Sequence, residues 1–426
     1  MIKTFHASSL TLKLLPLVLF FLLSSCGGGE GAGSEFLPPA LVTPIPGVVT
    51  PIAAGKLLPV QVTTIQTENE LMTTAVNPQN NDVYIATLNG SSVFDSYSTL
   101  LVMRPDNVTG LLTQTWIVYK VQGLQWVTQI RVDPAGKYIY FYGRTDGGGG
   151  MAISVYGVNS DGMPFYLRTT AVGAGNLFNC CFNTLTGITL TPDGRYIYGY
   201  YPVHTFGVIS ESVTAYGVDQ DANITSLDSV SLPYIFQSSN GSPSVVHTLV
   251  ASNQYVYVQH QDGSGISTYR NNNGQLTLVS DGANVNTTNR ALAMAIDPSG
   301  KFLYAAALVD NQIKIYVHSV ATNGSLEIVN IVDGISSGGT PFDMTIDASN
   351  RYLYLFQSDG IGMYRISKPG EVLVPLGMQS TYKNSNIGVE SPGFFAMNPS
   401  GKYLYTLGLT DKPTLSTYLI AQPVTN

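Results

Sequence analysis

Four side chains of this chain are candidates for acid–base or electrostatic catalysis. A hydrolytic site needs a base and a polarising cation. His204, His247 and Glu390 are the candidate bases, and Arg290 is the candidate cation. Convergence of Arg290, His247 and Glu390 with shifted pKa values would indicate an enzyme. The sequence names these four residues as catalytic candidates and leaves open whether the chain is an enzyme.

Two of the three cysteines, Cys180 and Cys181, are adjacent. In an oxidising compartment they can pair only with each other or with another molecule, because Cys26 is expected to carry lipid. A disulfide between adjacent cysteines closes a strained ring, and strained disulfides tend to be labile. A vicinal disulfide that stiffens the loop, a redox function and two buried thiols all stay open at this point.

One short acidic segment has the beginning of a calcium-loop pattern. It runs Asp219-Gln220-Asp221-Ala222-Asn223, but the Gly at the sixth position and the later bidentate Glu are missing. Other repeats of the chain place a turn at this point, as at Asn272-Asn273-Gly274. We therefore predict a turn here, with no metal site and no cofactor.

The N-terminus has the pattern of a lipoprotein export signal. Lys3 and Lys13 form a basic head, and an apolar run follows at residues 14–23 that is too short to span a bilayer. Leu23-Ser24-Ser25-Cys26 resembles the lipobox of bacterial lipoproteins, in which the Cys is diacylated and becomes the new N-terminus. Gly27 after the Cys favours the outer membrane of a Gram-negative host, and more than one acyl chain anchors a protein stably. The alternative is an ordinary signal peptide with a chance cysteine.

The chain divides into three predicted parts. Residues 1–25 are the signal peptide, and residues 26–54 are a lipidated, Gly- and Pro-rich tether that cannot bury a core. Residues 55–426 are the folded domain. The expected partners are the membrane, reached through the lipid, and an envelope protein, a glycan or a small molecule. We expect a monomer in the bacterial cell envelope.

Composition favours an all-β domain and argues against nucleic-acid binding. Only 11% of the 426 residues are charged, 44% are hydrophobic, and Gly (43) and Tyr (26) are abundant. This composition is typical of a β-rich protein with many turns. The formal net charge is −7, whereas binding to phosphate backbones depends on clustered Lys and Arg.

An internal repeat predicts the fold. Seven copies, spaced by 47 to 59 residues, each place a Tyr seven residues after their start. The fourth position is always Gly or Asn, which tolerate the positive φ of a tight turn, and the sixth is aromatic in six copies. The copies begin at Asn77, Asp133, Thr191, Val250, Asp297, Asp347 and Asn398 and end at Tyr84, Tyr140, Tyr198, Tyr257, Tyr304, Tyr354 and Tyr405. Each copy is one strand, a turn and the start of a second strand.

Two more strands complete each unit. A third strand with its own aromatic recurs downstream, as at residues 153–156, and a fourth follows a Gly-x-apolar turn, as at residues 274–276. Four strands per unit make a propeller blade. The last unit stops after its third strand near Ile420, whereas residues 55–65 match a fourth strand. We predict an all-β, seven-bladed β-propeller in which residues 60–65 lie beside residues 414–420 and close the ring.

The acidic and aromatic residues of the repeat are interpreted as structural. Asp133, Asp297 and Asp347 begin turns in which Asp caps its own backbone. The repeated Tyr side chains are expected to pack between blades, with their hydroxyls toward polar groups.

Ligand sites in propellers lie at one mouth of the central channel, where loops enter the innermost strands. The entry loops of this chain are long and variable, and loops on a rigid scaffold tend to carry function. The candidate ligand-binding residues in or near them are Trp126, Gln129, Tyr234, His247, Arg290 and Phe342.

The repeat resembles that of the seven-bladed lactonase-like propellers, which include bacterial 6-phosphogluconolactonase and the fungal muconate-lactonising enzymes. The resemblance covers about residues 55–421, through Asp-Pro-Ser-Gly-Lys-Phe-Leu-Tyr at 297–304 and Asn-Pro-Ser-Gly-Lys-Tyr-Leu-Tyr at 398–405. The activity of that family rests on three short motifs. The first is a His six residues before the repeat Pro of a middle blade. The other two belong to a later blade: a Pro-Arg-His just before its innermost strand and an Asn-Glu after its second strand. Those positions here hold Thr186, Ala291-Leu292-Ala293 and Ala307-Leu308.

The resemblance therefore implies a lactonase scaffold with altered catalytic positions. We predict an envelope-anchored, non-catalytic binding or interaction module that uses the channel-mouth loops. The alternative is a lactonase-like hydrolase or isomerase with divergent catalytic residues, and the third possibility is a structural subunit of an envelope assembly.

Overall fold

A computed structural model describes most of the chain between residues 53 and 422. The described ranges are 53–65, 71–90, 96–146, 150–172, 184–185, 187–205, 208–236, 245–246, 249–259, 265–281, 291–337, 339–368, 372–380, 395–409 and 413–422. Of the two compact units, Met1–Pro51 and Ile52–Asn426, these ranges belong to the second. The predicted signal peptide, Cys26, Cys180 and Cys181 lie outside the described residues.

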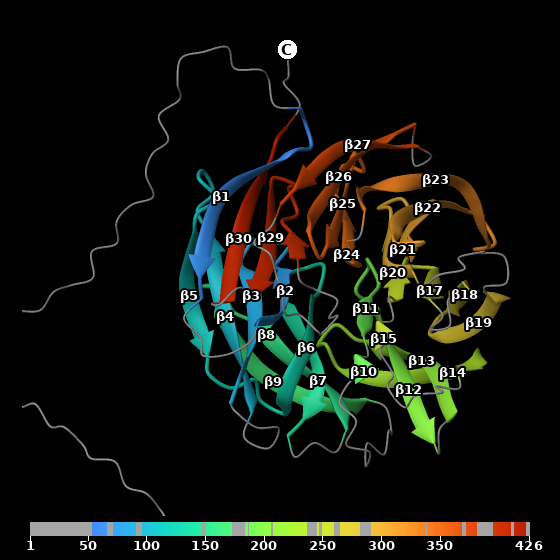
Figure 1. Cartoon of the computed structure of the whole chain (residues 1–426). Coiled ribbons are helices and arrows are strands. Elements are labelled where there is room, and N and C mark those ends of the chain that lie inside the picture. The colour runs from blue at the N-terminus through green and yellow to red at the C-terminus, as the bar shows by residue number, and fades with distance from the viewer. Residues whose placement is uncertain are drawn as a thin grey trace, which may run out of the picture. The chain divides into compact units, whose positions relative to one another are not determined.

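Seven four-stranded antiparallel sheets surround a central axis (Figure 1). The first three blades contain β2 (Leu71–Val76), β3 (Val83–Asn89), β4 (Tyr97–Pro105) and β5 (Leu112–Val118); β6 (Leu124–Val132), β7 (Tyr138–Thr145), β8 (Met151–Val158) and β9 (Pro164–Val172); and β11 (Ile188–Leu190), β12 (Tyr196–Thr205), β13 (Val208–Val218) and β14 (Ile224–Phe236). The next three contain β16 (Leu249–Ala251), β17 (Tyr255–Gln259), β18 (Ile266–Asn272) and β19 (Gln275–Asp281); β20 (Ala291–Ile296), β21 (Phe302–Val309), β22 (Gln312–Val320) and β23 (Leu326–Ser337); and β24 (Pro341–Ile346), β25 (Tyr352–Gln357), β26 (Gly360–Ser367) and β27 (Val372–Gln379). In each of these blades the first strand is innermost and sequence neighbours pair. The short β10 (Thr184–Leu185) and β15 (Val245–Val246) pair in parallel as a separate ladder.

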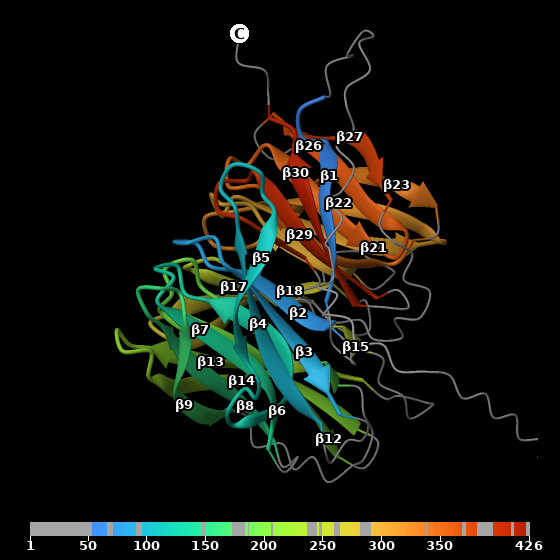
Figure 2. The same ribbon diagram turned by 90° about the vertical axis from the view of Figure 1, so that its left-hand side faces the viewer.

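The seventh blade joins the two ends of the domain. It contains β28 (Phe395–Met397), β29 (Tyr403–Leu409), β30 (Pro413–Ile420) and, as its outer strand, β1 (Leu57–Thr64). Leu57 lies opposite Ile420, and Thr64 lies opposite Thr414. Figure 2 shows β1 running alongside β30. The predicted closure is confirmed, and it pairs a sheet edge that would otherwise promote aggregation.

The apolar cores lie between neighbouring blades. One cluster, for example, packs Tyr304 and Ala306 of blade 5 against Leu353 and Leu355 of blade 6. All seven repeated Tyr residues are at most 1% exposed. Burial raises the pKa of Tyr84 to about 12, as expected when an ionised form would lose its hydration. The core therefore depends on aromatic side chains that the repeat places at fixed positions.

The hydroxyls of these Tyr residues differ in their partners. The side-chain amide of Asn77 donates to the hydroxyl of Tyr84 at 3.1 Å, and the Tyr354 hydroxyl donates to the carbonyl of Gly55 at 3.0 Å. The hydroxyls of Tyr198, Tyr257 and Tyr405 are buried without a hydrogen-bond partner among the described residues. The expected polar contact is thus found in some blades and is not found in others.

The acidic residues of the repeat cap their own turns, as interpreted from the sequence. Oδ1 of Asp347 accepts the backbone N–H groups of Arg351 at 2.7 Å and Tyr352 at 2.6 Å. Asp297 accepts the equivalent bonds from Lys301 at 2.7 Å and Phe302 at 2.8 Å. These bonds satisfy buried backbone donors at the tight turn.

The prediction of positive φ at the fourth position of the repeat is wrong in two copies. In the first copy the positive φ belongs to Asn81 (63°) rather than Asn80, because the turn closes with an Asn81 N–H bond to the Asn77 carbonyl. In the fourth copy the hairpin is two residues shorter and closes between Ser252 and Tyr255. Val250 consequently lies within β16, opposite Tyr257, and Asn253 is not among the residues with positive φ.

Contacts between blades explain why Gly and aromatic residues recur together. A Cβ on Gly110 would lie 2.3 Å from the ring of Tyr403, whose hydroxyl donates to the Val108 carbonyl at 3.2 Å. Gly324 approaches the ring of Tyr255 in the same way. The aromatic of one blade therefore packs under the turn between the third and fourth strands of the next blade, and this turn needs Gly because of both space and positive φ.

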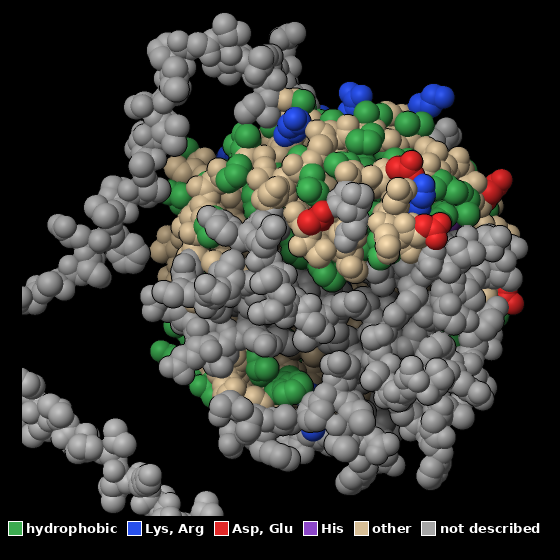
Figure 3. Space-filling model, viewed as in Figure 1, with side chains coloured by type: hydrophobic (Ala, Val, Ile, Leu, Met, Phe, Trp, Pro, Cys, Tyr) green, Lys and Arg blue, Asp and Glu red, His purple; other side chains and the backbone are tan. Residues whose placement is uncertain are grey.

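The described surface is weakly charged. In the view of Figure 3, Lys, Arg, Asp and Glu side chains lie scattered over the described part of the surface. No described segment forms a helix with the length and apolar character needed to cross a bilayer.

A candidate ligand site in the central channel

The central channel contains a pocket of about 980 Å³. Its walls come from the innermost strands β6, β11, β16, β20 and β24 and from the first hairpin turns of blades 3, 4 and 5. Because the strands alternate in direction, those turns share one face of the ring, which we call the turn face. The entry loops lie at the other face, which we call the loop face. The pocket thus reaches the turn face, whereas the sequence placed the ligand site on the loop face.

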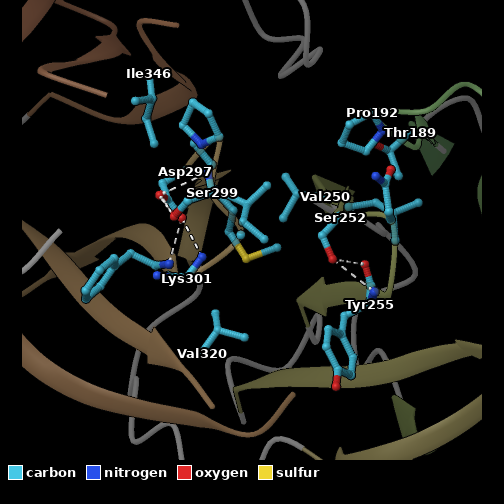
Figure 4. A pocket seen from close by; sticks show the side chains of 18 of the residues that line it. Thr189, Pro192, Val250, Ser252, Tyr255, Asp297, Ser299, Lys301, Val320 and Ile346 are labelled. Atoms are coloured by element: carbon cyan, nitrogen blue, oxygen red, sulfur yellow. Dashed lines mark hydrogen bonds between the residues drawn. The ribbon is translucent and has the colours of Figure 1, made fainter. Parts of the chain in front are cut away.

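The mouth of the pocket is polar. Figure 4 shows Asp297 and Lys301 on one side and Pro192 and Ser252 on the other. The Asp297 carboxylate accepts three backbone N–H bonds, a bond from the Ser299 hydroxyl and a bond from the Asn350 amide at 2.9 Å. This carboxylate is therefore committed to the turn and to the neighbouring blade, while the exposed Lys301 side chain remains at the mouth.

Two opposite charges line the interior of the pocket. Arg131 lies in β6 of blade 2, and Asp343 lies in β24 of blade 6. Burial lowers the pKa of Arg131, and the negative charge of Asp343 acts in the opposite direction. Nη1 of Arg131 donates to the Ile130 carbonyl at 3.0 Å, and Oδ1 of Asp343 accepts the Met344 backbone N–H at 2.8 Å. Both side chains therefore make polar contacts within the protein.

Arg131 was not among the ligand-binding candidates, which were chosen from the entry loops, but the repeat itself marks this residue as unusual. Arg131 lies two residues before the start of its turn, and its register partner is the repeated Tyr140. The residues opposite the repeated Tyr in the other blades are small and uncharged: Ala75, Thr189, Val250, Ala295, Thr345 and Ala396. A charged residue at a repeat position that is otherwise small indicates a local role beyond packing.

Gln129 is the ligand candidate that lines this pocket. Its side-chain carbonyl accepts the backbone N–H of Ile188 at 2.6 Å, and the residue is buried. Gln129 therefore joins blade 2 to blade 3 and holds the wall that carries Arg131.

Metal ligation has no support among the described residues, where no three His, Cys, Asp or Glu side chains gather. The segment that begins at Asp219 forms a capped turn: its carboxylate accepts the backbone N–H groups of Asp221 at 2.9 Å and Asn223 at 2.8 Å. Ala222 has a φ of 56° in this turn. The turn interpretation of this segment agrees with its structure.

Comparisons with known proteins agree with this architecture. No family model matches the chain. A carboxy-cis,cis-muconate cyclase from Neurospora crassa is 26% identical over 137 residues, which are 30% of this chain and 37% of the cyclase. The periplasmic gluconolactonase PpgL of Pseudomonas aeruginosa has a TM-score of 0.53 at 16% identity, covering 82% of this chain and 88% of PpgL. A Bacteroides uniformis protein with a provisional 6-phosphogluconolactonase assignment has a TM-score of 0.52 at 16% identity, covering 72% of this chain and 84% of that one. This chain has the lactonase-like seven-bladed propeller fold.

The lactonase-like propeller fold does not by itself select a function. A chain in the crystal structure of the mitotic checkpoint complex also matches, with a TM-score of 0.54 at 12% identity over 91% of this chain and 99% of that one. Function must therefore be argued from the side chains of the site.

Of the three segments that the resemblance aligns with the catalytic residues of the lactonase-like family, two lie in described strands, residues 291–293 in β20 and residues 307–308 in β21. Ala293 lies in β20 and Ala307 in β21, and both side chains are fully buried in the apolar cores between blades. Neither position offers a proton donor, a base or a cation. The third position, Thr186, lies outside the described residues.

The remaining candidates have separate locations in the lactonase-like propeller. The Trp126 indole N–H donates to the Ser96 hydroxyl, and the Arg144 guanidinium lies 5.6 Å from the centre of the indole ring. Phe342 packs against Phe356 with ring centres 6.2 Å apart. Neither Trp126 nor Phe342 is among the residues that line the pocket.

The four catalytic candidates are not brought together by any described contact. The backbone of His204 lies in β12 and that of Tyr234 lies in β14, but their side chains lie outside the described part. His247, Arg290 and Glu390 also lie outside the described residues. Their proposed roles therefore stay predictions.

Proposed function

We propose that this lactonase-like propeller is an envelope-anchored lipoprotein that binds a small ligand in its central channel and does not turn it over. The observation that carries the proposal is the occupation of two lactonase catalytic positions by the buried Ala293 and Ala307. The channel nevertheless contains a pocket of about 980 Å³ with charged side chains, within the size range of small-molecule sites.

Anchoring through Cys26 is supported by the lipobox pattern and by the short apolar run before it. The PpgL protein, which shares the fold, is described as periplasmic. Mass spectrometry of the wild-type N-terminal peptide should show an acylated Cys26, and replacement of Cys26 by Ser should abolish both the acylation and the new N-terminus at residue 26. A wild-type protein whose Cys26 carries no acyl group would contradict lipid anchoring.

Binding without turnover is tested by two measurements on the full chain in detergent. A thermal-shift screen of small polar metabolites should raise the melting temperature, because a ligand that binds only the folded state stabilises it by mass action. A hydrolysis assay with glucono-1,5-lactone should show no rate above the buffer background. Lactone turnover that the protein catalyses would refute the non-catalytic proposal.

The second candidate function is a lactonase-like hydrolase with divergent catalytic residues, favoured by the structural similarity to PpgL. In that case His247→Ala, Arg290→Ala and Glu390→Ala should each abolish hydrolysis of the lactone. Loss of lactone hydrolysis in these variants would assign the activity to the loop face. Unchanged hydrolysis rates would show that these three residues are not catalytic.

A further inference from the structure

We infer that the channel pocket binds a small organic carboxylate with an apolar body, and that the carboxylate lies at Arg131. This inference rests on the proposed binding function and adds the chemical class of the ligand. It follows from the hydrogen-bond donors that the pocket leaves available and from the character of its walls.

Arg131 directs most of its hydrogen-bonding capacity to no described residue. A guanidinium group has five N–H donors, and the bond that the described structure gives this side chain is the one from Nη1 to the Ile130 carbonyl. The residue is half-buried in the wall of the channel pocket, where donors without acceptors are costly. A carboxylate can accept two parallel bonds from a guanidinium, so it is the ligand group that best complements Arg131.

The two acidic side chains of the pocket are engaged by the protein itself. Asp297 accepts the bonds of its own turn and the bond from the Asn350 amide. Asp343 accepts the Met344 backbone N–H at 2.8 Å and makes a further interaction as well. Its negative charge also favours the cationic form of Arg131. The charged groups that remain for a ligand are therefore donors, which favours an anionic ligand.

Lys301 supplies a second cation, at the mouth of the pocket (Figure 4). It is exposed, and its backbone N–H rather than its ammonium group bonds to Asp297. The equivalent positions of the two preceding turns differ: Gln254 in blade 4 is uncharged, and Arg195 in blade 3 forms an ion pair with Asp193 at 3.0 Å. Of the described side chains at these three positions, that of Lys301 is the cation without an ion-pair partner, so it attracts an anion toward the mouth.

The remaining walls set the character of the rest of the ligand. Val250, Ile296, Val320 and Ile346 line the pocket, and each is half-buried. A ligand body that covers these side chains should be apolar, because hydroxyl groups placed against them would lose their hydrogen bonds to water. The volume of about 980 Å³ accommodates a ring or a branched chain beside the carboxylate.

Three probes test the inference on the unmodified full chain in detergent by isothermal titration calorimetry, with a detergent-only titration subtracted. The probes are 3-phenylpropanoate, its neutral amide, and gluconate, which has a carboxylate but a polar body. The 3-phenylpropanoate should bind, and the amide should bind at least about tenfold more weakly because it leaves the guanidinium without a counter-charge. Gluconate should also bind at least about tenfold more weakly. Equal affinity for the amide or for gluconate, or no detectable binding of 3-phenylpropanoate, would overturn the inference.

Two variants assign the carboxylate to its partners. Arg131→Gln should remove the preference for 3-phenylpropanoate over its amide. Lys301→Gln should weaken binding of 3-phenylpropanoate by about threefold and leave the amide unchanged, because an exposed charge contributes little. The matched controls are Arg365→Gln and Lys137→Gln, at exposed positions that do not line the pocket; Lys137 has the place of Lys301 in the turn of blade 2. If Arg131→Gln keeps the preference while remaining folded by circular dichroism, or if Lys137→Gln weakens binding as much as Lys301→Gln, the assignment is wrong.

The design separates the inference from the proposed function. If Arg131→Gln fails to fold, Arg131→Lys and the three probes on wild-type protein still decide the result, since the ammonium of Lys keeps the charge but not the two-pronged geometry. Failure of 3-phenylpropanoate to bind a protein that other metabolites stabilise would overturn the inference alone. Catalysed lactone hydrolysis would overturn the proposed function, whichever of the three probes binds.

Discussion

His318 should make the stability of the propeller depend on pH. The side chain is fully buried in blade 5, with Nδ1 3.3 Å from the Leu303 carbonyl and its ring stacked against Tyr316. Nε2 has no hydrogen-bond partner among the described residues. Burial lowers the pKa of His318 from 6.5 to about 4, because the charged imidazolium would lose its hydration.

The sign of the effect follows from proton linkage. The unfolded chain, with a His pKa of about 6.5, binds a proton more readily than the folded chain, so stability falls as pH decreases below about 6.5. A shift of this size costs about 2 kcal/mol at pH 5 and reaches about 3 kcal/mol below pH 4. The contribution is fully present only above pH 6.5, where His318 is neutral in both states.

Urea unfolding of wild-type protein and His318→Phe at pH 7.5 and pH 5.0 would measure the effect. Phenylalanine keeps a ring beside Tyr316 and removes the titrating group, so the variant should lose about 2 kcal/mol less than wild type between the two pH values. Contributions from the other His residues are common to both proteins and cancel in this difference. Equal losses for the two proteins would refute the argument from burial.

Three further perturbations have definite expected outcomes. Gly55→Ala should destabilise the domain by about 2 kcal/mol, because Gly55 has a φ of 87° and the new Cβ would lie 2.2 Å from the ring of Tyr352; thermal unfolding measures this. Deletion of β1 (Leu57–Thr64) should expose β30 and cause oligomers, which light scattering detects. Asp82→Asn should cost about 2 kcal/mol in urea unfolding, because the fully buried Asp82 carboxylate accepts two 2.7 Å bonds from Arg104.

The two point substitutions each have a matched control. Gly377→Ala introduces a Cβ into open space at a φ of 121°, so it should cost less than Gly55→Ala. Asp333→Asn removes the exposed partner of Lys314 and should change stability by less than about 1 kcal/mol. If either control equals its test variant, or if the protein without β1 stays monomeric, the corresponding argument fails.

The fold could be predicted because its determinants repeat. Buried Tyr residues such as Tyr304 and Tyr354 recur at one offset from a capped turn, and seven occurrences average out local exceptions. The shortened hairpin at Ser252 was not predicted. The start of each copy was placed seven residues before its Tyr, and this fixed spacing cannot reveal that the turn before Tyr257 lacks two residues. The repeat therefore predicts the number and strand order of the blades, but it does not predict the length of every turn.

The candidate site was harder to predict because side-chain direction depends on irregular pairing. In β6 the register shifts between Leu124 and Trp126 and again between Val127 and Gln129. Each bulge changes which later residues face a given side of the sheet, so the direction of Arg131 could not be derived from alternation alone. The sequence instead favoured the loop face, because the entry loops are long and differ from blade to blade.

The closure of the ring also has a kinetic consequence. It pairs the first strand of the domain to be synthesised with the last, since Leu57 lies opposite Ile420. Contacts between residues so far apart in sequence carry a large loop-closure cost and slow the final step of folding. Until β30 has emerged, β1 has no sheet to join, and the growing chain must remain protected from intermolecular strand exchange through its whole length.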